Sequence, residues 1–285
     1  MLAARVAIAE TNEDHLSTRN FARIVSHIRQ SCGITISEKK RVMLEGRLRR
    51  RLKVVGVADL DDYCDYVFAG HAEEEQQHLI NAVTTNKTDF FREPKHFEYL
   101  EDKILPEMAR QGQRKITVWS AACSTGAEPY TIAMLLDDFA GQRQGVSYQV
   151  LATDIDTQVL GHARRGIYNE ELLEPVPPAL HRKYVMKPRD TRCSEVRIAP
   201  RLRAAVAFGQ LNLMDASYGV GNQIDMVFCR NVLIYFEKET QELVVQRLVR
   251  CLKPGGHLFL GHAESITGFD VPVSQVGSTI FRKNG

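Results

Sequence analysis

Residues 116–134 read ITVWSAACSTGAEPYTIAM and join a short apolar run to a loop of small residues and then to a helical run. The apolar run at 116–119 is typical of a buried strand, and we expect the helix at 130–139. Small side chains in the loop, such as that of Ala122, let a ligand approach the backbone closely. The loop has one glycine and matches neither GxGxxG nor a P-loop, which argues against a phosphate cradle. The carboxylate of Glu128 would instead suit a ligand that carries a positive charge.

Strands and helices alternate through the rest of this part of the sequence, with short loops between them. We expect strands at 148–152, 224–229, 257–261 and 278–283, and helices at 157–164 and 238–252. Such alternation predicts an α/β fold with a doubly wound, mostly parallel sheet. Prolines and short alternating pieces interrupt this rhythm at 170–208, where we expect a small β-rich insertion.

The N-terminal part has a helical pattern throughout. Apolar residues recur at helical spacing from Phe21 to Ile28 and again from Leu44 to Val55. Glycines punctuate these segments, and Ser37 before a charged run is typical of a helix start. We therefore expect a small all-helical domain over residues 1–85.

Composition and charge are ordinary for a globular protein, with 44% hydrophobic residues, 25% charged residues and a net charge of +2. The longest apolar stretches are too short to span a bilayer, and we see no secretion signal. We therefore expect a cytoplasmic protein with no membrane insertion. The six cysteines form no metal-binding pattern, and we expect them to be free thiols.

Polar residues follow two more of the expected strands. Asp154 ends the second strand, where an acid can accept hydrogen bonds from both ribose hydroxyls of a nucleotide-type ligand. Alternatively, Asp154 is a solvated aspartate at a strand end. Asn231 and Tyr235 follow the third strand, where their amide and hydroxyl can face the same ligand. Alternatively, Asn231 caps the next helix and Tyr235 packs in the core.

One segment of the helical part is strongly basic. Between Lys39 and Lys53 there are eight basic residues and a single acid, Glu45. On a helical wheel, Arg49, Arg50 and Lys53 lie broadly opposite the apolar stripe. A charged face of this kind is usually solvated, but it can also steer a partner of opposite charge.

Four motifs are specific as an ordered set, and they are TNKTDFFR (85–92), SAACSTGAEPYTIAM (120–134), ATDID (152–156) and FCRNVLIYF (228–236). With them, nearly the whole chain resembles the chemoreceptor glutamate methyltransferases, the CheR family. The resemblance implies O-methylation of glutamate side chains on the cytoplasmic helical domain of chemotaxis receptors. It implies S-adenosyl-L-methionine as cofactor and S-adenosyl-L-homocysteine as product. It also implies a class I methyltransferase-like domain at 86–285 and, within it, a receptor-docking β-subdomain at 172–208.

The resemblance also implies roles for individual residues. The positions that match the family's cofactor site are Asn86, Thr88, Arg92, Ala122, Glu128, Asp154, Asn212, Leu213, Asn231 and Val232. Arg92 and Tyr235 match the region of the transferred methyl group and are the candidate catalytic residues. A receptor helix with several glutamates would suit four basic residues, Arg47, Arg49, Arg50 and Lys53.

The implied chemistry needs few catalytic groups. A glutamate carboxylate is ionised at neutral pH, so it attacks a methyl sulfonium without a general base. The site must mainly align the reactants and exclude water. Arg92 suits a forked bond to a carboxylate, and Tyr235 suits a hydrogen bond that orients the incoming glutamate.

The β-subdomain departs from the family at one loop. Some members capture a pentapeptide at the receptor tail with a glycine-rich loop, but here the loop reads KPRDTRCSE (187–195) and has no glycine. Pro188 lacks an N–H donor, and the neighbouring side chains are bulky. We therefore expect binding of the tail pentapeptide to be weak or absent.

Two other classes of function compete with this interpretation. A nucleic-acid methyltransferase could use the basic segment on phosphates, but the chain lacks the Asn/Asp-Pro-Pro-aromatic element of amino-methylating enzymes and its net charge is near zero. A non-catalytic regulator that binds S-adenosylmethionine is the second alternative. The presence of Arg92, Asn231 and Tyr235 favours an enzyme over that regulator, and we expect no nucleic-acid partner.

Overall fold

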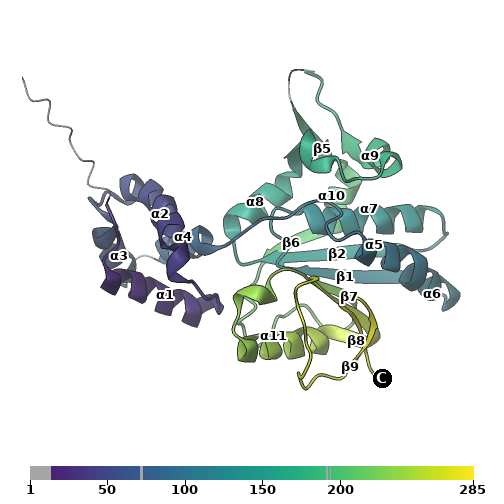
Figure 1. The fold of residues 1–285 in the computed structure, drawn as a ribbon. Coiled ribbons are helices and arrows are strands. Elements are labelled where there is room, and N and C mark those ends of the chain that lie inside the picture. Colours follow the sequence, from purple (N-terminus) through teal and green to yellow (C-terminus); the bar gives the residue numbers. More distant parts are fainter. Residues whose placement is uncertain (1–13, 71–72, 191, 193) are drawn as a thin grey trace, which may run out of the picture. The chain divides into compact units, whose positions relative to one another are not determined.

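The computed structural model describes residues 14–70, 73–190, 192 and 194–285, which fall into two compact units. The helical unit contains the described residues up to Gln30 and Ile36–Val83. The α/β unit contains Ser31–Thr35 and Thr84–Gly285. Figure 1 draws both units. The predicted fold class, an α/β domain with a mostly parallel sheet and a small all-helical domain, is confirmed.

The helical unit forms where the apolar spacing and the helix-end residues predict helices. Its elements are α1 (Thr18–Cys32), η1 (Glu38–Lys40), α2 (Arg41–Val55), α3 (Leu60–Phe68) and α4 (Glu73–Val83). Gly56 ends α2 in the left-handed region at φ 77°, which a residue with a Cβ adopts only with strain. Asp59 begins α3, because its side chain accepts a hydrogen bond from the backbone N–H of Asp62.

A buried acid ties α2 to its neighbours inside the helical unit. Glu75 on α4 is 5% exposed and accepts two hydrogen bonds from the Arg51 guanidinium, at 2.9 and 2.7 Å. It also accepts one from the Tyr63 hydroxyl of α3 at 2.7 Å. Burial would raise the pKa of Glu75, but the bonds from Arg51 and Tyr63 outweigh it and lower that pKa. Part of the basic segment therefore serves the fold.

The α/β unit is built on a seven-stranded sheet in the order β6-β2-β1-β7-β8-β10-β9. The strands are β1 (Lys115–Ala121), β2 (Ser147–Asp154), β6 (Val206–Gln210), β7 (Ile224–Cys229), β8 (Leu252–Leu260), β9 (Val273–Gly277) and β10 (Ile280–Lys283). The pairs from β6 to β8 are parallel, and β10 runs antiparallel between β8 and β9. Because β7 lies on the opposite side of β1 from β2, the direction of winding reverses between β1 and β7.

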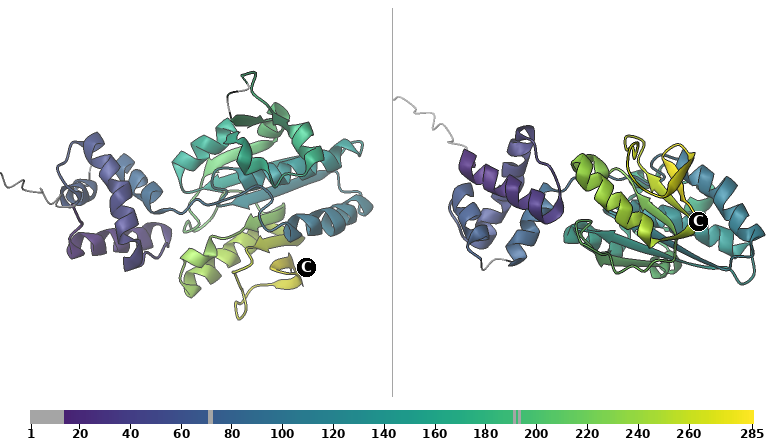
Figure 2. Two further views of the ribbon diagram at one scale, coloured as in Figure 1. Left: turned by 45° about the horizontal axis from the view of Figure 1, so that its top comes forward. Right: turned by 90° about the horizontal axis from the view of Figure 1, so that it is seen from below.

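Helices cover both faces of this sheet. They are α5 (Lys95–Tyr99), η2 (Leu100–Ile104), α6 (Leu105–Arg110), α7 (Ala127–Gly141), α8 (Thr157–Arg165), α10 (Pro200–Ala205), η4 (Leu233–Tyr235) and α11 (Lys238–Cys251). Successive strand residues point to opposite faces, so Val118 joins the core under α7 and Trp119 joins the core under α11. Figure 1 shows α7 and α11 on opposite sides of the strands, and Figure 2 shows the same layers from two other directions.

The β-rich insertion is a three-stranded antiparallel sheet in the order β3-β5-β4. Its elements are β3 (Ile167–Asn169), η3 (Glu170–Leu173), α9 (Pro178–Tyr184), β4 (Val185–Met186) and β5 (Glu195–Ile198). The expected range 172–208 needs correction at both ends, because β3 precedes it and β6 pairs with β2 in the large sheet. Alternation along a strand shows that it has two different faces, but it cannot show which sheet the strand joins.

Two further expectations concern the whole chain. No helix among the described residues is long and apolar enough to cross a membrane. The cysteines that the structure describes, at positions 32, 64, 123, 229 and 251, are buried, and those at 64, 123, 229 and 251 are free thiols, as expected. Cys193 lies outside the described residues.

The buried Glu75 predicts unequal effects for two neighbouring arginines on α2. We expect Arg51→Ala to lower the free energy of unfolding by about 2–3 kcal/mol, because it leaves a buried carboxylate without its cation. Arg50 is exposed, so Arg50→Ala should cost less than about 0.5 kcal/mol. Denaturant unfolding followed by circular dichroism measures both changes. Equal losses in the two variants would contradict the structural role of Arg51.

Candidate functional site

Polar residues gather where the parallel strands end. Ala122 follows β1, Asp154 ends β2, Asn212 follows β6 and Asn231 follows β7. The carboxyl ends of parallel strands meet at one edge of the sheet, and ligands bind there at the point where the winding reverses. The sheet therefore brings four residues to one edge, although the first and the last of them, Ala122 and Asn231, are 109 positions apart in the sequence.

The loop after β1 has an unusual backbone. Ala122 and Ser124 adopt left-handed φ angles of 64° and 50°, which cost about 1–2 kcal/mol each for residues with a Cβ. Gly126 follows at φ 94°, and an added Cβ there would lie 2.9 Å from both Ala163 Cβ and the Tyr168 hydroxyl. Strain of this kind persists where the surroundings fix it, and it is common at ligand sites.

Asp154 fixes part of this loop. Its side chain accepts hydrogen bonds from the backbone N–H of Ser124 at 2.8 Å and of Asp156 at 2.9 Å, one on each oxygen. The residue is 6% exposed, and burial raises the pKa of Asp154 to about 6. The backbone N–H of Ile155 is a third donor to this carboxylate, which can accept about four hydrogen bonds. Asp154 therefore keeps acceptor capacity for hydroxyl groups of a ligand.

Asn86 is tied to the same edge of the sheet through Asp156. The Asn86 amide donates to the Asp156 carboxylate at 2.7 Å, and the Ser124 hydroxyl donates to the Asn86 carbonyl at 2.9 Å. Asp156 also caps α8 by accepting from the N–H groups of Gln158 and Val159. Thr88, farther along this segment, is partly buried. Asp156 therefore joins the segment at Asn86 to the start of α8, and Asn86 in turn contacts the loop after β1.

A buried cation of the site, Arg230, was missed by the sequence analysis. It follows β7, and its side chain is 2% exposed. Its guanidinium lies 3.0 Å from Glu93, 3.1 Å from Glu128 and in hydrogen-bond contact with the Arg92 carbonyl. The sequence did contain a signal for Arg230, because a charged residue directly follows the apolar strand IDMVFC.

The two partners of Arg230 have different electrostatic surroundings. Burial would raise the pKa of Glu93, but the hydrogen bond from Asn231 and the charge of Arg230 outweigh it and hold that pKa at about 2. Glu128 accepts a 2.6 Å bond from the Ser120 hydroxyl and lies at the start of α7. Burial raises the pKa of Glu128, although Arg230 opposes this effect. Both oxygens of Glu128 already have a protein donor.

Glu264 holds the loop after β7. Its carboxylate accepts from the backbone N–H groups of Asn231, Val232, Leu233 and Gly261, at 3.0, 2.8, 2.8 and 2.5 Å. Asn231 is thereby kept at a left-handed φ of 59°. Gly261 must lack a side chain, because an added Cβ would lie 2.5 Å from the Asn231 amide nitrogen. No local sequence pattern marks Glu264, because it lies more than 30 residues from the loop after β7 that it holds.

Some of the remaining predicted residues make hydrogen bonds within the protein, and others are buried or partly buried. Asn231 donates its amide to Glu93 at 3.1 Å, and Asn212 donates its amide to the Ser31 carbonyl at 2.6 Å. Leu213 is buried, and Val232 is partly buried. Arg92 donates to the Lys87 carbonyl at 2.9 Å, while Tyr235 is partly buried in η4.

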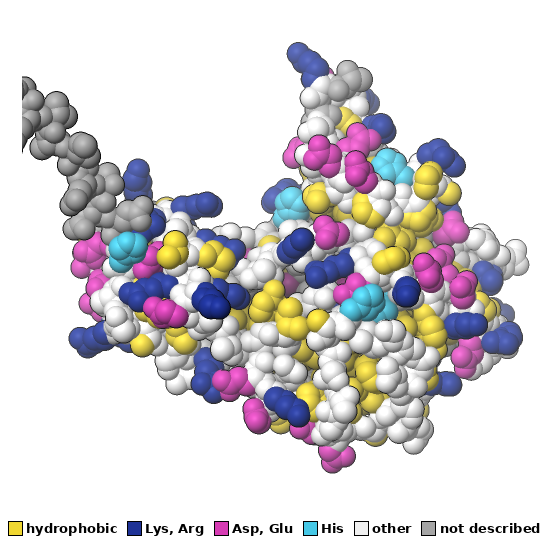
Figure 3. Space-filling view, viewed as in Figure 1, with side chains coloured by type: hydrophobic (Ala, Val, Ile, Leu, Met, Phe, Trp, Pro, Cys, Tyr) yellow, Lys and Arg dark blue, Asp and Glu magenta, His cyan; other side chains and the backbone are white. Residues whose placement is uncertain are grey.

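The basic face of α2 makes backbone contacts within the helical unit. Arg47 donates to the Ala82 carbonyl at 2.8 Å, and Arg49 donates to the Asp14 carbonyl. Arg50 and Lys53 are exposed. Figure 3 shows basic and acidic side chains interspersed on the visible face of this unit. A helical wheel does not include such carbonyl contacts, and the set of Arg47, Arg49, Arg50 and Lys53 stays a prediction for partner binding.

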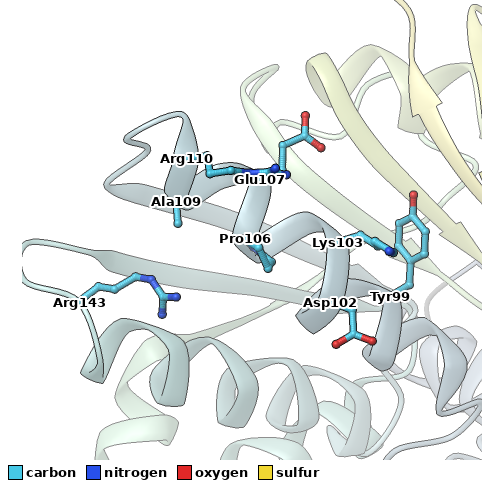
Figure 4. A pocket seen from close by; sticks show the side chains of 8 residues that line it. All are labelled: Tyr99, Asp102, Lys103, Pro106, Glu107, Ala109, Arg110 and Arg143. Atoms are coloured by element: carbon cyan, nitrogen blue, oxygen red, sulfur yellow. The ribbon is translucent and has the colours of Figure 1, made fainter.

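A separate pocket lies away from the strand ends. Its volume is about 710 Å³, and Figure 4 shows its lining side chains on α5, η2, α6 and the loop after α7. They are Tyr99, Asp102, Lys103, Pro106, Glu107, Ala109, Arg110 and Arg143. None of these residues is among the predicted site residues.

Because Glu264 accepts four backbone hydrogen bonds, we expect its replacement by Gln to lower the free energy of unfolding. Glu264→Gln replaces one acceptor oxygen with an amino group that faces backbone N–H donors, so we expect a loss of about 2–3 kcal/mol in the free energy of unfolding. Glu239→Gln makes the same change at an exposed position of α11 and should cost less than about 0.5 kcal/mol. Guanidinium unfolding compares the two variants. A Glu264→Gln variant as stable as the control would refute this role.

Comparisons with known proteins agree with this architecture. A chemotaxis protein methyltransferase from Klebsiella aerogenes is 43% identical over 266 residues, which cover 93% of this chain and 90% of the relative. Its counterpart from Salmonella typhimurium is 41% identical and covers 97% of this chain and 94% of the relative. The counterpart from Escherichia coli is 41% identical, with coverages of 93% and 91%.

Two family models match adjacent parts of the chain. One is described as the CheR methyltransferase, all-alpha domain, and matches residues 19–84. The other is described as the CheR methyltransferase, SAM binding domain, and matches residues 86–282. Together with the seven-stranded sheet and its polar strand ends, these matches show that the chain belongs to the CheR family of S-adenosylmethionine-dependent chemotaxis methyltransferases.

Proposed function

We propose that this protein transfers the methyl group of S-adenosyl-L-methionine to glutamate side chains on the cytoplasmic helical domain of chemotaxis receptors. The products would be glutamate methyl esters and S-adenosyl-L-homocysteine, and the protein would act in the cytoplasm during sensory adaptation. The observation that carries the proposal is the buried Asp154 carboxylate beside the left-handed loop at Ala122, where the sheet reverses its winding. The names of the chemotaxis relatives support the receptor as the substrate.

The chemistry of the strand-end residues fits this cofactor. Asp154 keeps acceptor capacity for ribose hydroxyls, and its burial strengthens such bonds. When bound, S-adenosylmethionine supplies a methyl group on a positively charged sulfur. Glu93 and Glu128 pair with the buried cation Arg230, and the buried carboxyl groups of Asp154, Asp156 and Glu264 lie at the same edge of the sheet. This excess of acids favours a ligand with positive charge.

We propose three groups of contacts to the cofactor: the residues that line it, the Glu128 carboxylate and the Arg92 guanidinium. Asn86, Thr88, Ala122, Asn212, Leu213, Asn231 and Val232 are proposed to line the cofactor. Glu128 would offer its remaining lone pairs to the amino group of the cofactor while it anchors Arg230. Arg92 is partly exposed and already donates to Lys87, so a second arm of its guanidinium remains for a carboxylate.

The acceptor side of the reaction needs alignment more than proton transfer. The glutamate that attacks is ionised at neutral pH, and its carboxylate displaces the thioether directly. We propose that Tyr235 orients this carboxylate with its hydroxyl, and that Arg92 and Tyr235 together exclude water from it. Arg50 and Lys53 would attract the acidic receptor helix. The receptor's tail pentapeptide would contribute little to this recognition.

The raised pKa of Asp154 predicts that cofactor binding depends on pH. The ionised carboxylate accepts both hydroxyl bonds, so cofactor affinity should fall by up to about tenfold per pH unit as the pH drops below about 6. We expect Asp154→Asn to bind about 1–3 kcal/mol more weakly at pH 7.5 and to lose this pH dependence. Titration calorimetry between pH 5 and 7.5 measures both effects.

The control for this titration is Asp270→Asn, which makes the same change at an exposed position. It should reproduce the wild-type affinity at every pH. An Asp154→Asn variant that keeps the wild-type affinity, or a wild type whose affinity does not change with pH, would contradict the assignment of Asp154 to the ribose.

The proposed substrate is tested by the transfer of labelled methyl groups. Label from radioactive S-adenosylmethionine should enter receptor and should be released by mild alkali, because methyl esters hydrolyse there and methylated amines do not. Label in DNA or RNA, or no label in any acceptor, would refute the proposed reaction. Replacing Arg50 and Lys53 with Glu should slow labelling of receptor at low salt without changing cofactor affinity, and added salt should reduce this difference.

A further inference from the structure

Three side chains with metal-binding atoms meet beside Arg230. Glu93 precedes α5, His96 lies on α5, and His262 follows β8. The Glu93 Oε2 atom is 3.6 Å from Nδ1 of His96 and 4.0 Å from Nε2 of His262. All three donor atoms lie within 4.8 Å of one another. We call these residues the Glu93–His96–His262 cluster.

His96 is held in the tautomer that a metal ligand requires. The side chain is 1% exposed, and its Nε2 atom lies 3.3 Å from the Ser278 carbonyl and 3.0 Å from the Thr279 hydroxyl. A carbonyl oxygen only accepts hydrogen bonds, so a bond to Ser278 places the proton on Nε2 and leaves Nδ1 with a free lone pair. Metal-bound histidines are typically oriented in this way, with the other ring nitrogen donating to a carbonyl or carboxylate.

No described residue donates a hydrogen bond to Nδ1 of His96, which is buried. Nδ1 lies 3.6 Å from the Glu93 carboxylate, whose oxygens accept hydrogen bonds from Arg230 and Asn231. With the proton on Nε2, both Nδ1 and the carboxylate oxygen are hydrogen-bond acceptors. Two acceptors at this separation are stabilised when a cation lies between them.

We propose that the Glu93–His96–His262 cluster binds a divalent transition-metal ion such as Zn²⁺. Two imidazole nitrogens and one carboxylate oxygen form a common ligand set for Zn²⁺, which keeps a fourth position for water. Zinc bonds of about 2.0–2.1 Å in a tetrahedron place the donors about 3.3 Å apart. The side chain of His262 is 46% exposed, so it is free to move the short distance that this spacing requires.

Metal binding at this cluster affects the strand-end site. The Glu93 Oε2 atom that faces both histidines is 3.0 Å from Arg230, and Oε1 accepts from Asn231 at 3.1 Å. A metal ion competes with Arg230 for the first oxygen, and the positive charge of Arg230 limits the affinity of the ion. On the basis of the proposed function, the ion acts as an inhibitor, because it weakens the bonds that hold Asn231 and Arg230 in place.

The site is tested first by metal binding alone. The metal-free full chain is titrated with Zn²⁺ in a calorimeter, and cobalt absorption reports on nitrogen and oxygen ligation. We expect one site in the wild type and a loss of affinity of about tenfold or more in His262→Ala. His181→Ala, which removes a partly exposed histidine of α9, should match the wild type. No binding by the wild type, or equal binding by His262→Ala, overturns the proposal.

The inhibitory effect is tested separately by cofactor affinity. Zn²⁺ at saturating concentration should weaken binding of S-adenosylmethionine by the wild type about tenfold and leave His262→Ala unaffected. An unchanged affinity in the zinc-loaded wild type overturns the inhibitory role. Failure of the metal-free protein to bind S-adenosylmethionine would instead refute the proposed function, and the zinc titration would still decide whether the metal site exists.

Discussion

The buried guanidinium of Arg230 is the constraint on which the site depends. Removing a charge from water is costly, so the fold must supply compensating partners, and it does so with Glu93, Glu128 and the Arg92 carbonyl. These partners come from the segment before α5 and from the start of α7. Arg230 thereby fixes the end of β7 relative to two elements that are distant in sequence. The candidate residues Arg92 and Asn231 are positioned by this arrangement.

Carboxylates organise the other strand-end loops in a similar way. Asp154 and Asp156 accept from backbone N–H groups after β1 and β2, and Glu264 accepts from the loops after β7 and β8. These bonds keep Ala122, Ser124 and Asn231 in backbone conformations that would otherwise be unfavourable. The site is thus ordered before any ligand binds, which lowers the entropy cost of binding. The same acids give this edge of the sheet the negative character that suits a sulfonium.

Local patterns were sufficient to predict most of the fold. The strand at 224–229 and the helix at 238–252 were predicted within one residue of β7 and α11, because each carries an unbroken apolar run or a helical period. β9 was not predicted, since its residues are mostly exposed and lack an apolar signal. The carbonyl contacts of Arg47 and Arg49 were not predicted, because their partners lie 35 residues away along the chain.

The sequence by itself determined the class of fold and the polar residues that follow the parallel strands. Through four specific motifs, it also determined the family. It placed Asp154 and Asn231 at one edge of the sheet, because parallel strands have their carboxyl ends together. Only the tertiary structure decided the partners of Arg230, the four bonds to Glu264 and the meeting of His96 with His262. The reason is physical: a buried polar group is satisfied by whichever elements pack around it, and a local sequence pattern contains no record of that packing.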